Sequence, residues 1–359
     1  MARLALLDPT KTGKQAQDLE NKLRRMVVGQ DEAIHEIVRT YQTHVAGLAP
    51  SGRPIANFLF LGPTGSGKTR IVEATAECLL NDPRAVIKID CAEFQHSHEI
   101  AKLIGSPPGY LGHRETHALL SQEALNQYHT EKTKISIVLF DEIEKASDAL
   151  WNLLLGILDK GVLTLGDNRK VDFSSAMIFL TSNLGASEMS ALANPRLGFH
   201  FAKADDDESK EEVKGRMSRI GVAAARSKFT PEFVNRLDKI VVFKPLGREE
   251  LSRIVEIELD IVQKRLQKAA GGVSFEVDVT EAACDFLLDE GTDLRYGARH
   301  LKRAIERYLV QPLSNLIASG QIQRGDLIRV SHREDLSSLM FFLDVGASES
   351  WRTARPVAA

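Results

Sequence analysis

The chain has 359 residues, of which 43% are apolar and 26% are charged, and its formal net charge is −3. This composition predicts a soluble globular protein with room for two domains, and the small net charge argues against binding to nucleic acid or a membrane surface by charge attraction alone. No apolar run approaches the roughly 18 residues of a membrane-spanning helix. The three cysteines are too scattered for a disulfide framework and indicate a reducing, cytoplasmic setting.

The first half of the chain alternates between helical and strand patterns. Residues 1–27 are polar and are expected to form a short helical lead-in. The helix that follows has an apolar face made of Ala33, Ile34, Ile37, Val38, Tyr41 and Val45. Five apolar runs, separated by helical segments, are then candidate strands: Phe58–Leu61, Val86–Ile89, Ile135–Phe140, Met177–Leu180 and Ile240–Phe243. Strands that alternate with helices predict a parallel sheet covered by helices on both faces.

The pattern changes near residue 247. The expected elements there are a helix over 248–269 ended by Gly271-Gly272, a strand over 273–279, a helix capped by Thr280, a helix over 297–318, and strands at 327–330 and 339–343. We therefore expect a large α/β domain over residues 28–246, a smaller and mainly helical domain over 247–345, and a disordered tail over 346–359.

A glycine-rich segment joins the first candidate strand to the next helix. Its residues, which fit the phosphate-loop pattern G-x-x-x-x-G-K-[ST], are Gly62, Pro63, Thr64, Gly65, Ser66, Gly67, Lys68 and Thr69. Glycines allow a tight turn whose N–H groups face a polyphosphate, and the helix over 69–80 directs its positive end at the same anion. Lys68 can reach the β- and γ-phosphates, and the Thr69 hydroxyl can bind Mg²⁺. The segment predicts a site for a nucleoside triphosphate.

Two carboxylates follow the candidate strand over 135–140. Asp141 is expected to hold Mg²⁺, directly or through water, and Glu142 is expected to orient and deprotonate the attacking water. The alternative is an acidic strand end in solvent, which the nearby phosphate-loop motif disfavours. Asn183 ends the next strand, where its amide can position the water or touch the γ-phosphate. An ordinary asparagine turn is the alternative there.

Two arginines are further candidates for contact with phosphate. Arg236 can act as an arginine finger on a neighbouring subunit. Arg299 opens a helix of the second domain, where the macrodipole mildly disfavours a cation, and can sense the γ-phosphate there. Without further context, each is also readable as a surface arginine.

Together these motifs resemble the AAA+ ATPases and, within them, the Clp unfoldase and disaggregase group, in particular the second ATPase ring of ClpA, ClpB and ClpC. The likeness covers about Val27 to Val330. It implies a P-loop NTPase fold with a three-layer parallel sheet, followed by a small helical lid domain. It further implies ATP and Mg²⁺ as ligands, ATP hydrolysis, and a ring of identical subunits, expected to be a homo-hexamer with nucleotide at the subunit interfaces.

The resemblance also implies roles for single residues. Val28 falls in the family's adenine-side box, Asn183 falls on sensor 1, Arg236 on the arginine finger and Arg299 on sensor 2. Gly109, Tyr110, Leu111 and Gly112 resemble the axial pore loop, in which a glycine-flanked aromatic grips an extended polypeptide without reading its sequence. The implied function is the threading and unfolding of polypeptide substrates.

The pore-loop segment is not a complete match. A tyrosine buried in a Pro-Gly turn is the alternative reading of Tyr110. After Gly112 the chain reads His113-Arg114-Glu115, where the family usually has acidic residues and glycine. Residues 159–173 are similar to the segment that carries a second pore loop, less closely at its centre.

Leu197, Gly198 and Phe199 resemble the tripeptide with which some relatives dock on the ClpP peptidase. An exposed apolar tip of this kind can insert into a pocket of a partner, and a loop anchor packed on its own domain is the alternative. Two other function classes stay open. One is an ATP-regulated assembly or scaffold partner that does not thread substrate. The other is a nucleic-acid motor, which the acidic balance and the aromatic pore loop disfavour.

Overall fold

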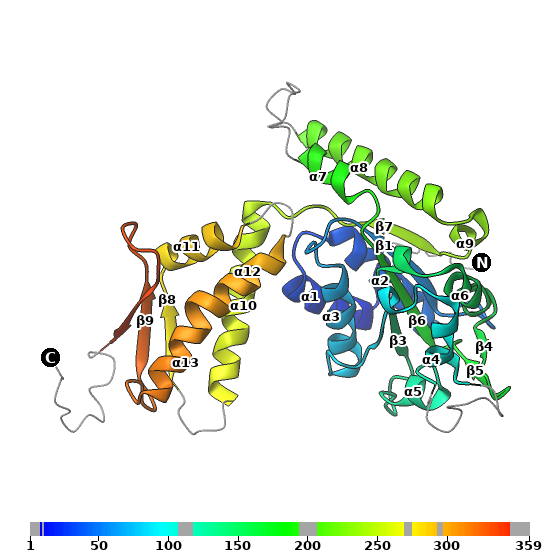
Figure 1. The fold of residues 1–359 in the computed structure, drawn as a ribbon, viewed down its shortest axis with the longest axis horizontal. Coiled ribbons are helices and arrows are strands. Elements are labelled where there is room, and N and C mark those ends of the chain that lie inside the picture. Colours follow the sequence, from blue (N-terminus) through cyan, green and yellow to red (C-terminus); the bar gives the residue numbers. More distant parts are fainter. Residues whose placement is uncertain are drawn as a thin grey trace, which may run out of the picture. The chain divides into compact units, whose positions relative to one another are not determined.

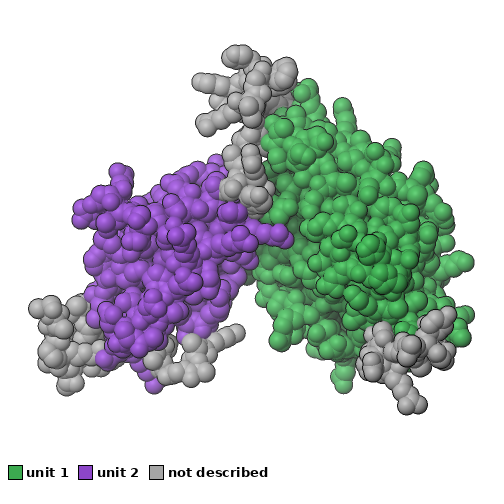
Figure 2. Space-filling view, in the orientation of Figure 1, with its two compact units in different colours: residues 1–245 green, residues 246–359 purple. Residues whose placement is uncertain are grey.

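The fold is described from a computed structural model. The described residues are 8, 11–106, 118–193, 207–268, 275–292 and 297–344. The chain divides into two compact units, residues 1–245 and residues 246–359, coloured green and purple in Figure 2.

Unit 1 is built on a five-stranded, wholly parallel sheet, of which Figure 1 labels β1, β3, β6 and β7. Its strand order is β2-β3-β6-β1-β7. The strands are β1 (Ala56–Leu61), β2 (Ile87–Asp90), β3 (Ser136–Asp141), β6 (Ala176–Ser182) and β7 (Lys239–Val242). β1 and β6 are buried along their whole length, which is why both appear in the sequence as continuous apolar runs. The predicted parallel α/β fold is confirmed.

Helices cover both faces of this sheet. The helices of unit 1 are α1 (Lys14–Met26), α2 (Asp31–Val45), α3 (Lys68–Leu80), α4 (Ala101–Ile104), α5 (Gln122–Asn126), α6 (Asp148–Lys160), α7 (Ala186–Ala193), α8 (Asp207–Lys228) and α9 (Pro231–Asn235). Along β1, Phe58 and Phe60 join the core formed with α1, α2 and α3, whereas Leu59 and Leu61 join the opposite core. The period of two along each strand therefore fills two hydrophobic layers and gives three layers of structure.

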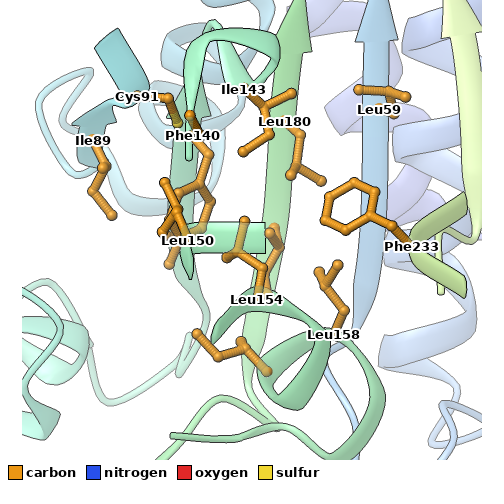
Figure 3. Packing of buried hydrophobic residues seen from close by; sticks show 14 of the residues in the cluster. Leu59, Ile89, Cys91, Phe140, Ile143, Leu150, Leu154, Leu158, Leu180 and Phe233 are labelled. Carbon is orange, nitrogen blue, oxygen red and sulfur yellow. The ribbon is translucent and has the colours of Figure 1, made fainter. Parts of the chain in front are cut away.

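Figure 3 shows the second of these cores. Leu59 and Leu180, from neighbouring strands, lie over Leu154 and Leu158 of α6 and over Phe233 of α9, and all five side chains are buried. The last turn of α6 is thereby fixed against the sheet. On the other face, the predicted apolar stripe of α2 stops before its final residue, because Val45 is 51% exposed at the end of the helix.

A short antiparallel hairpin follows α6. It consists of β4 (Val162–Thr164) and β5 (Lys170–Asp172), and its inner side chains Leu163 and Val171 are buried in the core of the α6 face. Strands of three residues are too short to produce a recognisable run, and the sequence patterns did not predict them as strands.

Unit 2 combines helices with a three-stranded sheet of order β10-β9-β8. Its elements are α10 (Arg248–Lys268), β8 (Glu276–Val279), α11 (Glu281–Gly291), α12 (Ala298–Ile305), a π-helical turn (Glu306–Val310), α13 (Gln311–Ala318), β9 (Leu327–Ser331) and β10 (Met340–Leu343). β8 runs parallel to β9, and β10 runs antiparallel to it. The side chain of Gln263 in α10 lies along β8, donating to the Phe275 carbonyl at 3.0 Å and accepting from the Val277 N–H at 3.0 Å.

Two local predictions for unit 2 need correction. The helix expected over 297–318 contains the π-helical turn, because Pro312 has no N–H to continue the regular ladder and the wider turn lies just before it. Thr280 occupies the N-cap position of α11, but its side chain makes no capping bond, and its Oγ1 is buried without a hydrogen-bond partner among the described residues.

No helix within the described ranges has both the length and the apolar character needed to cross a membrane.

Candidate functional site

The phosphate loop leaves the carboxyl end of β1 and enters α3. Gly62, Gly65 and Gly67 have φ angles of 145°, 78° and 99°, which favour glycine. A Cβ at Gly62 would also lie 2.5 Å from the carbonyl oxygen of Phe243, so the backbones of the loop and of the residue after β7 meet directly. The loop ends at the first turn of the 13-residue helix α3. The N–H groups of that first turn have no partners within the helix and can therefore donate to an anion.

Lys68 lies with its ammonium group over this loop. The side chain is buried, and Nζ donates to the carbonyls of Gly62 and Pro63 at 2.7 and 2.9 Å and to Oδ1 of Asn183 at 3.0 Å. A buried ammonium group needs such acceptors to offset its lost hydration. Phosphate oxygens are acceptors of the same kind with a full negative charge, so they can compete for this group.

Thr181 organises the acidic end of β3 from the neighbouring strand β6. Its hydroxyl donates to Asp141 Oδ1 and accepts from the N–H of Glu142 at 3.1 Å. The other oxygen of Asp141 lies 3.3 Å from Nζ of Lys88. Glu142 has a φ of 58°, a left-handed conformation that costs a non-glycine residue about 1–2 kcal/mol. Its backbone is therefore held by its surroundings, as is common at functional sites.

Asn183 connects the lysine of the phosphate loop to this acidic end. Its Oδ1 accepts from Lys68, and its Nδ2 donates to Oε1 of Glu142 at 3.3 Å. Its own N–H donates to Oε1 of Glu144 at 3.0 Å, which fixes its backbone. Lys145 donates to the second oxygen of Glu142, and this bond raises the pKa of Lys145. Both oxygens of the Glu142 carboxylate are thus held.

Gln30 links the loop to the segment after β7. Its buried amide donates to the carbonyls of Ser66 and Lys244, both at 3.0 Å, and accepts from the Lys244 N–H at 3.2 Å. Val28 lies two residues earlier and is half-buried. The segment around Val28 is therefore joined directly to the phosphate loop.

Arg236 lies elsewhere, next to the amino end of β7. Its guanidinium group pairs with Asp159 of α6, and its carbonyl accepts from Nδ2 of Asn57 at 3.1 Å. Asn57 is the second residue of β1. The phosphate loop follows the last residue of β1, at the opposite end of the strand. The structure thus separates Arg236 from Lys68, Glu142 and Asn183 of the same chain.

Comparison with known proteins places this geometry in a family. The model of the AAA domain (Cdc48 subfamily) matches residues 53–240, and the model of the C-terminal D2-small domain of ClpB matches residues 246–330. The chain is a ClpB-like member of the AAA+ ATPases. The family predicted from the sequence motifs is thereby confirmed.

Individual relatives give the extent of this likeness. The chain is 39% identical over 312 residues to the chaperone protein ClpB of Rhizobium meliloti (strain 1021), and 41% identical over 307 residues to ClpB of Meiothermus ruber. These matches cover 87% and 86% of this chain but only 33% of each relative, so the chain spans about a third of their length. A cryo-EM reconstruction of Hsp104 in a closed state with ATPγS and FITC casein matches with a TM-score of 0.72 and 31% identity, over 92% of this chain and 52% of that one.

For the other predicted site residues of this AAA+ chain, the hydrogen bonds and ion pairs described above do not test the predicted roles. Arg299 lies in the first turn of α12 in unit 2, and its role as sensor 2 stays a prediction. The pore-loop residues Gly109, Tyr110, Leu111 and Gly112 lie outside the described residues, as does the tripeptide Leu197, Gly198 and Phe199.

The sequence patterns gave no individual role to three residues that hold this site together, Gln30, Thr181 and Lys145, or to Asn57 at the opposite end of β1. A signal existed for Asn57 and Thr181, because both are polar residues within otherwise apolar buried strands, where a polar side chain needs a specific partner.

Proposed function

We propose that this AAA+ chain binds ATP with Mg²⁺ at the phosphate loop and hydrolyses it. The observation that carries the proposal is the contact of Asn183 with both Lys68 and Glu142, because it connects the phosphate-binding cation to the candidate general base. A lysine at the start of α3, with a carboxylate and an amide just past neighbouring strands, matches the roles needed for phosphoryl transfer to water.

The residues fit a magnesium-bound triphosphate. The Thr69 hydroxyl and the Asp141 carboxylate would hold Mg²⁺, which when bound neutralises charge on phosphate oxygens. Lys68 exchanges its loop carbonyls for phosphate oxygens, and the first turn of α3 donates N–H groups to them. Glu142 accepts the proton of the attacking water, for which one of its two held oxygens must be released by Asn183 or Lys145. Asn183 keeps the water and the γ-phosphate in line.

The position of Arg236 supports action on a neighbouring subunit. β1 has six residues, and at about 3.3 Å per residue it spans about 20 Å, which exceeds the length of an arginine side chain. Arg236 lies beside the start of this strand, and the phosphate loop follows its end. It therefore acts, in our proposal, as an arginine finger for the ATP of an adjacent copy in a homo-hexameric ring, with Arg299 as sensor 2.

We further propose that the ring couples hydrolysis to the threading and unfolding of polypeptides in the cytoplasm, with Tyr110 as the gripping residue. The ClpB likeness over both units supports this, as does the likeness to the Hsp104 reconstruction with FITC casein. A ClpP-type peptidase that docks on Leu197, Gly198 and Phe199 is the proposed partner if degradation follows unfolding.

The test measures ATP hydrolysis and the ATP-dependent unfolding of a tagged fluorescent protein in the same samples. Glu142→Gln is expected to bind ATP but to lose at least about 100-fold in hydrolysis, because the general base is gone. Glu131→Gln, an exposed site, is the matched control. Tyr110→Ala is expected to hydrolyse ATP without unfolding the substrate, and Tyr110→Phe is expected to retain unfolding because the aromatic ring remains.

Three results would contradict parts of this proposal. Hydrolysis by Glu142→Gln at the wild-type rate would remove its role as base. Vigorous hydrolysis without unfolding, unchanged by Tyr110→Ala with any client, would favour an ATP-regulated assembly partner. Stimulation of hydrolysis by DNA in a salt-sensitive way would favour a nucleic-acid motor.

A further inference from the structure

The last turn of α6 is linked to Arg236 in two ways, directly to its side chain and, through Asn57 of β1, to its backbone. The guanidinium group pairs with Asp159, the penultimate residue of α6. The fully buried amide of Asn57 donates to the carbonyl of Leu158 at 2.9 Å and to the carbonyl of Arg236 at 3.1 Å. A displacement of the end of α6 is therefore transmitted to Arg236 by two independent contacts.

The β4–β5 hairpin is joined stiffly to this turn. Gly161 ends α6 with a φ of 60°, and its N–H donates to the carbonyl of Ile157 at 2.9 Å. The carbonyl of Gly161 in turn accepts from the N–H of Phe173 at 2.7 Å, which closes the base of the hairpin. Phe173 is fully buried, and a Cβ at Gly161 would lie 3.2 Å from the backbone of Arg53. The hairpin and the end of α6 are packed as one piece.

The tip of the hairpin contacts a second segment of unit 1. The N–H of Gly166 donates to the carbonyl of Ile104 at 2.8 Å, and a Cβ at Gly166 would lie 2.5 Å from the carbonyl oxygen of Gly105. Such a close backbone approach is possible only with glycine at position 166. The strip of residues 102–105 is also bonded on another side, because Leu119 and Leu120 donate to the carbonyls of Lys102 and Leu103 at 3.2 and 3.1 Å.

We propose that the β4–β5 hairpin is a connecting strut between the 102–105 strip and Arg236. Asp159 is the positioning residue at one end, and Gly166 is the contact at the other. The strip and Leu119 flank the segment that contains Tyr110, so force on that segment reaches the hairpin through Gly166 and changes the position of the guanidinium group. The inference rests on the proposed function, because it requires Arg236 to act on ATP in an adjacent subunit.

The test compares kcat and KM for ATP, with and without denatured casein as the polypeptide probe. Asp159→Asn is expected to lower kcat several-fold with little change in KM, and Asp159→Glu is expected to restore it, because a carboxylate again faces Arg236. Asp260→Asn, at an exposed carboxylate of α10, is the control. Gly166→Ala is expected to keep the basal rate and lose the response to casein, a coupling of about 5-fold or more.

Further variants separate the strut from general damage to the fold. Gly156→Ala in the exposed part of α6 is the matched control for Gly166→Ala, because its Cβ meets only ordinary contact at 3.8 Å. Thermal melting is recorded for every variant, and if Gly166→Ala melts early, the Asp159 series decides. The double variant of Asp159→Asn and Gly166→Ala is expected to lose no more of the casein response than the more impaired of the two single variants, because both residues lie on one path.

The outcomes distinguish the strut from the proposed function. If Arg236→Ala hydrolyses ATP like the wild type, both proposals fall, because the arginine finger is absent. If Arg236→Ala is inactive while Asp159→Asn and Gly166→Ala keep the wild-type kcat and casein response, the strut alone is overturned. A loss of kcat in Asp159→Asn that Asp159→Glu does not restore would also overturn it.

Discussion

Polar residues lie at both ends of the parallel sheet in unit 1, but the contacts that hold their side chains differ between the two ends. At the carboxyl ends of the strands, Lys68 and Glu142 contact groups that a phosphate or a water molecule can replace, namely loop carbonyls and the Asn183 amide. At the amino ends, Asn57 and Arg236 are held by the backbone and a carboxylate of the chain itself.

The difference shows how one sheet serves two sites. The carboxyl end offers exchangeable contacts, which suit a site that binds and releases a ligand. The amino end is a fixed mount, which suits a side chain that must be presented to another molecule at a defined place. Substitutions at the two ends should therefore have different consequences, and four predictions follow this contrast from the largest effect to the smallest.

Gly62→Ala should disrupt the phosphate loop at the carboxyl end of the sheet and have the largest effect on stability. The added Cβ would lie 2.5 Å from the Phe243 carbonyl oxygen and 2.9 Å from its Cβ. Overpacking and the positive φ together should cost about 3 kcal/mol of unfolding free energy. Gly215→Ala in α8 is the matched control, because its Cβ meets nothing within 4 Å and should stabilise the helix by about 0.5–1 kcal/mol. Equal denaturation midpoints for the two variants would refute this account of the loop.

Asn57→Leu should break the amino end. The substitution keeps the branched shape of the side chain but leaves the carbonyls of Leu158 and Arg236 without this donor, which should cost about 2 kcal/mol in chemical denaturation. Asn152→Leu, at an exposed position of α6, is the control and should change stability by less than about 0.5 kcal/mol. If the buried variant is as stable as the wild type, the amino end is not a fixed mount.

Lys145→Ala sharpens the description of the carboxyl end. Lys145 and Glu142 are 48% and 29% exposed, so their pair should contribute less than about 1 kcal/mol to stability. Because one oxygen of the Glu142 carboxylate is then released, we expect a basal ATPase rate at or above that of the wild type, measured at saturating ATP. A loss of activity as large as that of Glu142→Gln would show instead that Lys145 takes part in the reaction.

The smallest expected effect concerns Cys91, a buried thiol near the acidic carboxyl end of β3. Burial, followed by the negative charge of Asp141, raises the pKa of its thiol well above the ordinary value of 9.0. Because the folded-state pKa is raised, the contribution to stability is complete below about pH 9 and is lost as the pH rises further. At pH 8, alkylation of Cys91 should therefore occur only on unfolding, and rapid labelling of the native protein would contradict this.

The sequence was sufficient for the parts of the fold that depend on local patterns. The five apolar runs lie in the five strands of the parallel sheet, and the runs of β1, β3 and β6 are continuous because these strands are buried on both faces. Their neighbours in the sequence placed Asp141 and Asn183 at strand ends and Lys68 in the loop after a strand, and the structure brings Lys68 and Asn183 into contact.

Contacts between distant segments could not be predicted in this way. The pairing of Arg236 with Asp159, the approach of Gly166 to Gly105, and the bonds of Gln30 to Lys244 each join residues that no periodicity relates. The packing of whole elements determines these contacts, so they appear only when the topology is known. The left-handed backbone of Glu142 likewise depends on Thr181 of the next strand.

The side chain of Gln263 has a consequence for how unit 2 behaves among unfolded chains. An unpaired strand edge is a template on which an extended polypeptide can add as a further strand and seed aggregation. By bonding Phe275 and Val277, this one amide occupies backbone groups at the β8 edge that such a strand would use. A protein proposed to handle unfolded polypeptides thus has a built-in guard against capture of its own clients at that edge.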